Sequence, residues 1–296
     1  MICAAIDIGS NTTRLLVAEP QGSQLRKVME QRAYTAIGKD AAKSKGKISP
    51  EKIDEVAEVV TTQVRLAREM GAEMIRTVAT AAIREAKNSE KVAKKISKEA
   101  DVELEVLSEE EEGRYAFLGA TKSLGHTVDG TIAVVDVGGN SSEVIFGSAD
   151  GGVEEVRSWK IGSGSLTGAH LQSDPPSASE IRSLRDAIGD YFEDVEFDQP
   201  DQAVAVGGSA TSLRTLVGVV LEYETLERAV RVLSSDPIEE VAQRFELDPR
   251  RVKLLPSGVL LLEKLSELLG QPLQIGKGGL REGIILDQLN EGTIPA

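Results

Sequence analysis

The chain has 296 residues, with 34 Lys or Arg against 48 Asp or Glu, so its formal net charge at pH 7 is −14. This length indicates one large domain or two ordinary ones, and the 41% hydrophobic content is enough for a folded core. The acidic balance argues against a broad binding surface for nucleic acid or an anionic membrane, because like charges repel at long range. With one cysteine and two histidines, the chain cannot form an internal disulfide and offers few ligands for a zinc site.

The N-terminal segment does not have the pattern of a secretory signal. Asp7 interrupts the first apolar stretch after six residues, and no run reaches the roughly 18 apolar residues of a membrane span. We therefore expect a soluble cytoplasmic protein without a membrane partner.

An internal repeat lies near the start of the chain. Residues 4–17 read AAIDIGSNTTRLLV, and residues 133–146, at an offset of 129, read AVVDVGGNSSEVIF. Each copy is an apolar β-rich run that ends in Asp, then a Gly/Asn/Ser turn, then a second β-rich run, which is typical of a β-hairpin. We interpret the repeat as the duplication of a whole domain. It predicts an N-terminal domain over 1–125 and a C-terminal domain over 126–296.

Helical and strand patterns alternate between and after the hairpins. Ser49 and Pro50 are typical of the N-cap and first residue of a helix that ends before Gly71. The next predicted elements are a strand over 74–79, a helix over 81–100, a strand over 102–107, and a helix that Ser108 caps and that runs to about Leu124. After the second hairpin we expect a loop over 162–179, a helix over 180–192, a strand over 203–206, and helices over 210–220, 250–269 and 280–289.

This alternation predicts α/β layers, and the duplication predicts two lobes with a cleft between them. The apolar stripe of 250–269 fits either a core helix or the face of a homodimer, and we favour the core.

Both hairpin turns have the composition of an anion site. Glycine lets the backbone approach an anion, and successive N–H groups form a concave binding turn. The Asp beside each turn repels an anion, so a bridging Mg²⁺ or water would be needed. One turn alone fits an ordinary hairpin whose Asp caps the turn equally well, but two copies in facing lobes favour a phosphate clamp. Its candidate contacts are Ser10, Asn11, Gly138, Gly139, Asn140 and Ser141.

A third turn contains Gly207, Gly208 and Ser209, between a predicted strand and a predicted helix. N–H groups at a helix start bind anions, so Gly208 and Ser209 are candidate phosphate contacts. Taken alone, a tight strand-to-helix turn explains the glycines better. The chain has neither GxGxxG nor GxxxxGK[ST], which argues against a Rossmann or P-loop site.

Glu112 is the candidate general base. Ser108 and Glu111 have the spacing of a capping box, which leaves the neighbouring Glu112 without a capping role. A carboxylate near a phosphate clamp can orient or deprotonate an attacking water. Arg84, at a strand-to-helix junction, and Lys277, in a glycine-rich turn, are candidate phosphate-binding cations. Such residues are more often surface charges, but ligand sites of α/β proteins commonly form at a strand-to-helix junction, so a phosphate contact and a surface charge explain Arg84 equally well.

Together these motifs resemble the exopolyphosphatase and guanosine pentaphosphate phosphohydrolase family, within the actin-like, sugar-kinase-like superfamily. The matching segments follow one another along essentially the full chain: 7–15, 80–88, 111–114, 136–143, 207–211 and 279–283. Asn140, Gly113 and Ser165 depart from the family pattern, which usually has a glycine, an alanine and, in many members, an arginine there.

The resemblance implies two ribonuclease-H-like lobes around a cleft and Mg²⁺-dependent hydrolysis of a terminal phosphoanhydride bond. It implies that Glu112 is the base, that Asp136 and Glu143 lie near the metal and the lytic water, that Asp7 assists, and that Arg84 clamps phosphate. We predict an exopolyphosphatase that releases orthophosphate from inorganic polyphosphate; the alternative is a guanosine pentaphosphate 5′-phosphohydrolase. A nucleotide-binding regulator that has lost catalysis and a kinase of the same superfamily are the alternatives from other classes.

Overall fold

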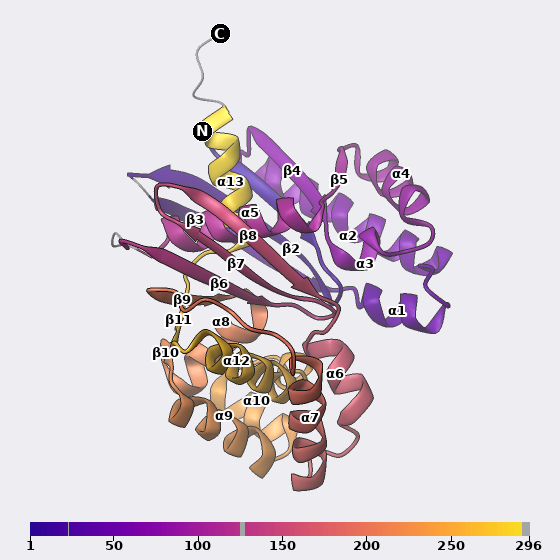
Figure 1. Cartoon of the computed structure of the whole chain (residues 1–296). Helices are drawn as coiled ribbons and strands as arrows, with labels where there is room; N and C mark the ends of the chain where they lie inside the picture. The colour runs from indigo at the N-terminus through magenta and orange to yellow at the C-terminus, as the bar shows by residue number, and fades with distance from the viewer. Residues whose placement is uncertain (23, 125–127, 292–296) are drawn as a thin grey trace. The chain divides into compact units, whose positions relative to one another are not determined.

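The computed structural model describes residues 1–22, 24–124 and 128–291 (Figure 1). The chain divides into two compact units, one formed by Met1–Gly125 with Gly278–Ala296 and the other by His126–Lys277. The sequence-based division assigned 278–296 to the second domain. The structure corrects this assignment, because the last helix of the chain packs in the first unit.

The first unit is built on a five-stranded mixed sheet with the order β3-β2-β1-β4-β5. The strands are β1 (Cys3–Ile8), β2 (Thr12–Gln21), β3 (Gln24–Tyr34), β4 (Met74–Ala79) and β5 (Leu104–Val106). The β1–β2 and β2–β3 pairs are antiparallel, whereas β4 runs parallel to both β1 and β5. The sheet thus joins a meander to two parallel crossover strands.

Helices cover both faces of this sheet (Figure 1). They are α1 (Ile37–Lys43), α2 (Pro50–Glu69), α3 (Ala81–Arg84), α4 (Ser89–Ala100), α5 (Glu109–Lys122) and α13 (Leu280–Glu291). Successive side chains of a strand point to opposite faces, and β1 is buried on both. Ile6 belongs to the core beneath α2 and α4, whereas Cys3 belongs to the core beneath α5 and α13.

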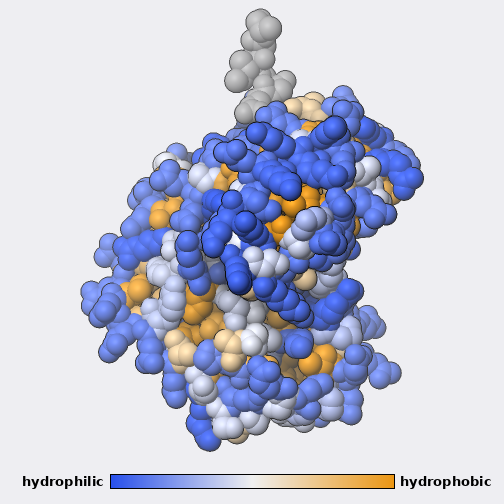
Figure 2. All heavy atoms as spheres, turned by 90° about the vertical axis from the view of Figure 1, so that its right-hand side faces the viewer, coloured by the Kyte–Doolittle hydropathy of each residue, from blue (hydrophilic) through white to orange (hydrophobic). Residues whose placement is uncertain are grey.

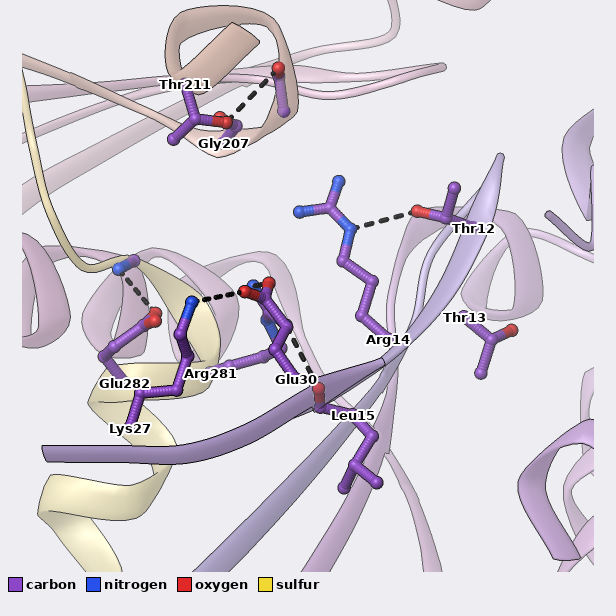
Figure 3. A network of polar contacts seen from close by, with 12 residues as sticks. Thr12, Thr13, Arg14, Leu15, Lys27, Glu30, Gly207, Thr211, Arg281 and Glu282 are labelled. Atoms are coloured by element: carbon purple, nitrogen blue, oxygen red, sulfur yellow. Dashed lines mark hydrogen bonds and ion pairs between the residues drawn. The ribbon is translucent and has the colours of Figure 1, made fainter. Parts of the chain in front are cut away.

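The C-terminal helix α13 completes the second of these cores. Its Ile284 and Ile285 are fully buried in a cluster with Cys3. Arg281 donates to Glu30 Oε1 at 2.8 Å and to the carbonyl of Leu15 at 3.4 Å, which fastens α13 to β2 and β3 (Figure 3). Apolar burial and an ion pair therefore both hold α13 in the first unit.

The second unit contains a six-stranded sheet with the order β10-β11-β9-β6-β7-β8. Its strands are β6 (Thr131–Val137), β7 (Ser142–Ser148), β8 (Gly152–Trp159), β9 (Gln202–Val206), β10 (Val220–Leu221) and β11 (Leu273–Ile275). Its helices are α6 (Ser163–His170), α7 (Ala178–Tyr191), α8 (Gly207–Val217), α9 (Tyr223–Ser235), α10 (Ile238–Phe245), α11 (Pro249–Val252) and α12 (Leu255–Leu269). The apolar stripe of α12 is buried in the core, as we favoured.

The two units repeat the same strand arrangement. An antiparallel meander precedes a parallel crossover strand in each, in the corresponding orders β3-β2-β1-β4 and β8-β7-β6-β9. The residue pairing preserves the offset of the sequence repeat, because Asp7 lies opposite Arg14 and Asp136 lies opposite Glu143. The predicted fold of two duplicated α/β domains is confirmed.

The predicted helix over 250–269 is interrupted at Lys253 and Leu254, between α11 and α12. Two other local predictions are also wrong. The segment 81–100 forms two helices, because Asn88 exchanges hydrogen bonds with the backbone of Ile48 between α3 and α4. The segment 162–179 is not all loop, because α6 starts at Ser163, whose N–H donates to the carbonyl of Gly138 at 2.9 Å. Both differences arise from contacts with residues far away in the sequence.

Candidate active site

In the first hairpin turn, between β1 and β2, two backbone carbonyls accept hydrogen bonds from residues at the start of α1. The carbonyl of Ser10 accepts from Gly38 N–H at 2.8 Å, and that of Asn11 accepts from Ala36 N–H at 3.0 Å. Within the described residues, the N–H groups of Ser10 and Asn11 donate to no protein acceptor. The turn therefore presents donors, the arrangement that binds an anion.

The second hairpin turn, between β6 and β7, repeats this arrangement. The carbonyl of Gly138 accepts from the N–H and hydroxyl of Ser163, and that of Gly139 accepts from the N–H groups of Gly164 and Ser165. In the part of the chain that the structure covers, no protein acceptor receives the N–H of Gly139 or Asn140. In both units, backbone N–H groups at the start of a helix donate hydrogen bonds to the carbonyls of the turn. Within the described residues, two N–H groups of each turn are left without a protein acceptor.

Two carboxylates lie beside the second turn. Asp136 and Glu143 are directly opposite on β6 and β7, so their side chains share one face of the sheet. Glu143 is buried, and Ser158 donates to its Oε1 at 3.3 Å. Asp136 is half-buried and rests against Gly207, where an added Cβ would lie 2.1 Å from Asp136 Oδ1. The backbone of Gly207 also has a positive φ of 80°, so glycine is required there for two reasons.

The third turn, between β9 and α8, is buried against neighbouring groups of the second unit. Gly208 and Ser209 are buried, and the hydroxyl of Ser209 donates to the carbonyl of Val137 at 3.4 Å. Arg251, which is also buried, places its guanidinium where a Cβ on Gly208 would lie 2.7 Å away. Gly207 and Arg251 are not among the site residues predicted from the sequence. The positive φ of Gly207 and the approach of Arg251 depend on the folded chain.

Arg84 and Glu112 form an ion pair in the first unit. Arg84 Nη1 donates to Glu112 Oε2 at 2.8 Å and to the carbonyl of Leu107 at 2.9 Å. The two side chains are only 18% and 15% exposed, which limits screening by water. The cation that sequence analysis proposed as a phosphate clamp thus contacts the carboxylate proposed as the base.

The neighbouring Glu111 has the capping role that its spacing predicts. The Ser108 hydroxyl accepts from Glu111 N–H at 3.2 Å, and Ser108 N–H donates to Glu111 Oε2 at 2.8 Å. The hydrogen bond from Ser108 N–H holds the pKa of Glu111 below its ordinary value. The capping box is confirmed, and it occupies Glu111 and not Glu112.

Asp7 lies at the end of β1, opposite Arg14 on β2. Burial raises the pKa of the Asp7 carboxyl, while the positive charges of Arg14 and Arg281 oppose this rise. Arg14 donates from Nε to Thr12 Oγ1 at 3.0 Å (Figure 3). Lys277 is exposed and follows β11 at the end of the second unit.

The described acidic residues provide at most part of a metal site. Among the described residues, no three His, Cys, Asp or Glu side chains form a group that could hold a metal ion by themselves. Mg²⁺ commonly uses only one or two carboxylates, with waters and substrate phosphates as its other ligands. The adjacent Asp136 and Glu143 fit such a partial shell, whereas Asp7 belongs to the other unit.

The comparisons with known proteins identify the family. A model described as the Ppx/GppA phosphatase family matches residues 16–291. The chain belongs to this family. The predicted membership and the prediction of a hydrolytic enzyme are thus confirmed.

Individual relatives match over nearly the whole chain. Exopolyphosphatase 1 of Mycobacterium tuberculosis is 29% identical over 98% of this chain and 89% of the relative. A guanosine-5′-triphosphate,3′-diphosphate pyrophosphatase of Pseudoalteromonas atlantica is 26% identical over 97% of this chain but only 58% of the relative. The crystal structure of the Aquifex aeolicus Ppx/GppA family member has a TM-score of 0.83, with 31% identity over 100% of this chain and 99% of that one.

Within the described residues of this chain, no helix has both the length and the apolar character needed to cross a membrane.

Proposed function

We propose that the chain is an exopolyphosphatase, which hydrolyses the terminal phosphoanhydride bond of inorganic polyphosphate and releases orthophosphate. The observation that carries this proposal is the duplicated hairpin turn, which leaves backbone N–H donors over in each unit. A terminal phosphoanhydride offers many equivalent oxygens to such donors. The relatives named exopolyphosphatase, which match almost end to end, support the same substrate.

In this proposal Glu112 is the general base. It would accept a proton from the attacking water, and the Arg84 guanidinium at 2.8 Å would orient the carboxylate and offer positive charge to the phosphoryl group. Phosphoryl transfer depends mainly on positioning and charge stabilisation, so this chain need not supply a covalent nucleophile.

The phosphate oxygens would be held by backbone N–H groups of the two hairpin turns and of the turn at Gly208. Ser10 and Asn11 would contribute in the first unit, and Gly139, Asn140 and Ser141 would contribute in the second. The N–H of Gly138, a contact expected from the sequence, is already engaged, because it donates to the carbonyl of Ser141 at 3.0 Å. Lys277 would add an exposed cation, and Ser209 would add its N–H group, since its hydroxyl faces Val137. Asn140 presents a side chain where a third glycine would present none.

Asp136 and Glu143 would hold Mg²⁺, with Asp7 as a further candidate ligand. When bound, Mg²⁺ would neutralise charge on the phosphate oxygens and bring a coordinated water to the site. Gly207 supports this role, because only a residue without a Cβ leaves room for the Asp136 carboxylate. The cytoplasmic location and the homodimer considered from the sequence stay predictions, which cell fractionation and light scattering can check.

The deciding experiment measures orthophosphate release with Mg²⁺ from polyphosphates of graded length and, in parallel, from guanosine pentaphosphate. We expect a higher kcat/KM for polyphosphate and loss of activity on chelation with EDTA. A higher kcat/KM for guanosine pentaphosphate would replace the proposal by its alternative. Full activity in EDTA would remove Mg²⁺ from the mechanism, and phosphate transfer from ATP to an acceptor without release to water would favour a kinase.

A further inference from the structure

The charge of the first unit is distributed unevenly. The segment 39–98 carries 14 Lys or Arg against nine Asp or Glu, in a chain whose net charge is −14. Half of the chain's 16 lysines form a group in this segment, which we call the lysine row. It consists of Lys39, Lys43, Lys45, Lys47, Lys87, Lys91, Lys94 and Lys98, all of them exposed.

The lysine row is continuous across three elements. Lys39 and Lys43 are one turn apart on α1, and the loop after α1 lies against the residue that precedes α4. In that contact Lys87 N–H donates to the carbonyl of Gly46 at 2.8 Å, and Lys87 Nζ donates to the carbonyl of Lys45 at 2.9 Å. From Lys87 the row continues along α4 at spacings of three or four residues.

The charge of the row is left available. Among the described residues, no Asp or Glu lies within ion-pair distance of any of its eight lysines. Lys95, on another side of α4, is by contrast paired with both Asp54 and Glu99. Both carboxylate oxygens of Asp40 accept hydrogen bonds from Ser49. Glu85 and Glu90, which are close to the row in sequence, are exposed to solvent. Like charges side by side on a surface destabilise the fold, so exposure to water does not by itself explain why these lysines lie together.

The row begins at the candidate active site. Gly38, the residue before Lys39, donates to the carbonyl of Ser10 in the first hairpin turn. The part of the row that starts at Lys87 begins three residues after Arg84, and Arg84 contacts Glu112. Since α1 has seven residues and is therefore about 10 Å long, a linear anion held at the turn can extend onto the row. In Figure 1, α1, α3 and α4 follow one side of the first unit, and Figure 2, which views that side, shows mostly hydrophilic residues there.

We propose that the lysine row is an exosite that binds the distal phosphates of a polyphosphate chain while the terminal phosphate occupies the active site. This inference rests on the proposed function. Lysine ammonium groups act as point charges for phosphate, which suits a polymer whose repeating unit carries only charge. Segments 36–47 and 85–98 contain no Phe, Tyr or Trp, so they offer no stacking platform for nucleic acid bases.

The test compares two variants with the same change in net charge. The row variant combines Lys43→Gln, Lys47→Gln, Lys91→Gln and Lys94→Gln. The control variant, in the second unit, combines Arg182→Gln, Arg228→Gln, Arg231→Gln and Lys253→Gln, which are also exposed. Lys87 is kept in both, because its ammonium group holds the loop after α1.

We expect the row variant to raise KM for long-chain polyphosphate about tenfold at low ionic strength, with kcat unchanged and tripolyphosphate kinetics within about twofold of the wild type. High salt should abolish the wild-type advantage, because it screens exposed charges. The control variant should resemble the wild type. An equal rise in KM for tripolyphosphate, or an equal effect in the control variant, would overturn the proposal.

Calorimetric titration with long-chain polyphosphate in EDTA measures binding without turnover. We expect weaker binding by the row variant only. If the wild type released no orthophosphate from any polyphosphate, the proposed function would fail, and this titration would still decide the fate of the exosite. Binding of a single-stranded oligonucleotide as tightly as polyphosphate, and its loss in the row variant, would overturn polyphosphate as the occupant.

Discussion

Glu111 and Glu112 are adjacent carboxylates with different surroundings. Glu111 closes a capping box with Ser108, whereas Glu112 accepts a hydrogen bond from Arg84. We predict that Glu112→Gln lowers kcat for orthophosphate release by about 10²–10⁴-fold, because the amide cannot accept the proton of water. Binding of substrate should persist, since Gln keeps an oxygen for Arg84. Steady-state kinetics together with calorimetric binding would check both parts.

The matched control is Glu111→Gln. Glutamine also satisfies a capping box, so the variant should keep both stability and turnover near the wild type. Equal losses of kcat in the two variants would indicate a general effect of the acidic first turn and would remove Glu112 as the base.

Glu30 makes the stability of the contact between α13 and the sheet depend on pH, because it pairs with Arg281 of α13. Burial raises the pKa of Glu30, but the charge and hydrogen bond of Arg281, with help from Lys27, outweigh it and lower the pKa to about 2 (Figure 3). A lowered pKa in the fold means that Glu30 stabilises the protein above its ordinary pKa of 4.5 and loses this effect as the pH falls towards 2.

We therefore predict that Glu30→Gln destabilises the protein by about 1 kcal/mol at neutral pH, as for a partly exposed ion pair. The difference from the wild type should shrink steadily below pH 4.5. Urea unfolding at a series of pH values measures it. A difference that stayed constant down to pH 3 would show that Glu30 acts by packing and not by its charge.

Helices α5 and α13 approach each other at glycines. A Cβ on Gly283 would lie 1.9 Å from the carbonyl oxygen of Tyr115, and one on Gly119 would lie equally close to the carbonyl oxygen of Gly279. These neighbours are backbone atoms, so the helices would have to separate to make room. We predict that Gly283→Ala lowers the free energy of unfolding by about 2 kcal/mol or more, as expected for overpacking.

Gly189→Ala is the matched control for this substitution. Gly189 is inside α7, and an added Cβ would meet no atom within 4 Å. Alanine favours a helix over glycine by up to about 1 kcal/mol, so this variant should be as stable as the wild type or more stable. Thermal or urea unfolding of both variants would distinguish the effect of the helix contact from a general effect of helical glycine. Equal stability of Gly283→Ala and the wild type would contradict the close approach.

The assignment of α13 to the first unit has a consequence for the only cysteine. Cys3 is fully buried in the cluster that Ile284 and Ile285 complete. A chain that ends at Lys277 lacks both residues, so we predict that thiol reagents label its Cys3 much faster than in the full chain. The rate should approach that of the full chain in urea.

Trp159, the only tryptophan, reports on the second unit in the same experiment. We expect its emission spectrum to stay native in the shortened chain, because 126–277 contains the whole second core. Slow labelling of Cys3 in the shortened chain would show that α13 is not needed to cover the cluster.

Several features of this fold could be predicted from short stretches of the chain. The hairpins at Asp7 and Asp136, the strand over 74–79, and the caps at Ser49 and Ser108 depend on residues within a few positions of one another. Alternating burial and capping geometry act over one turn or one strand, so the residues involved are neighbours in the sequence. The acidic net charge likewise follows from composition.

Other features required the tertiary structure. The break after Arg84 depends on bonds between Asn88 and Ile48, and the place of α13 depends on contacts with Cys3 and Leu16. The packing of Asp136 against Gly207, the ion pair of Arg84 with Glu112, and the joining of two lysine segments into one row also involve residues distant in sequence. Such contacts are selected by the shape and burial of the whole unit, which no local pattern contains. Composition therefore set the total charge of this protein, and only the folded chain decided where that charge gathers.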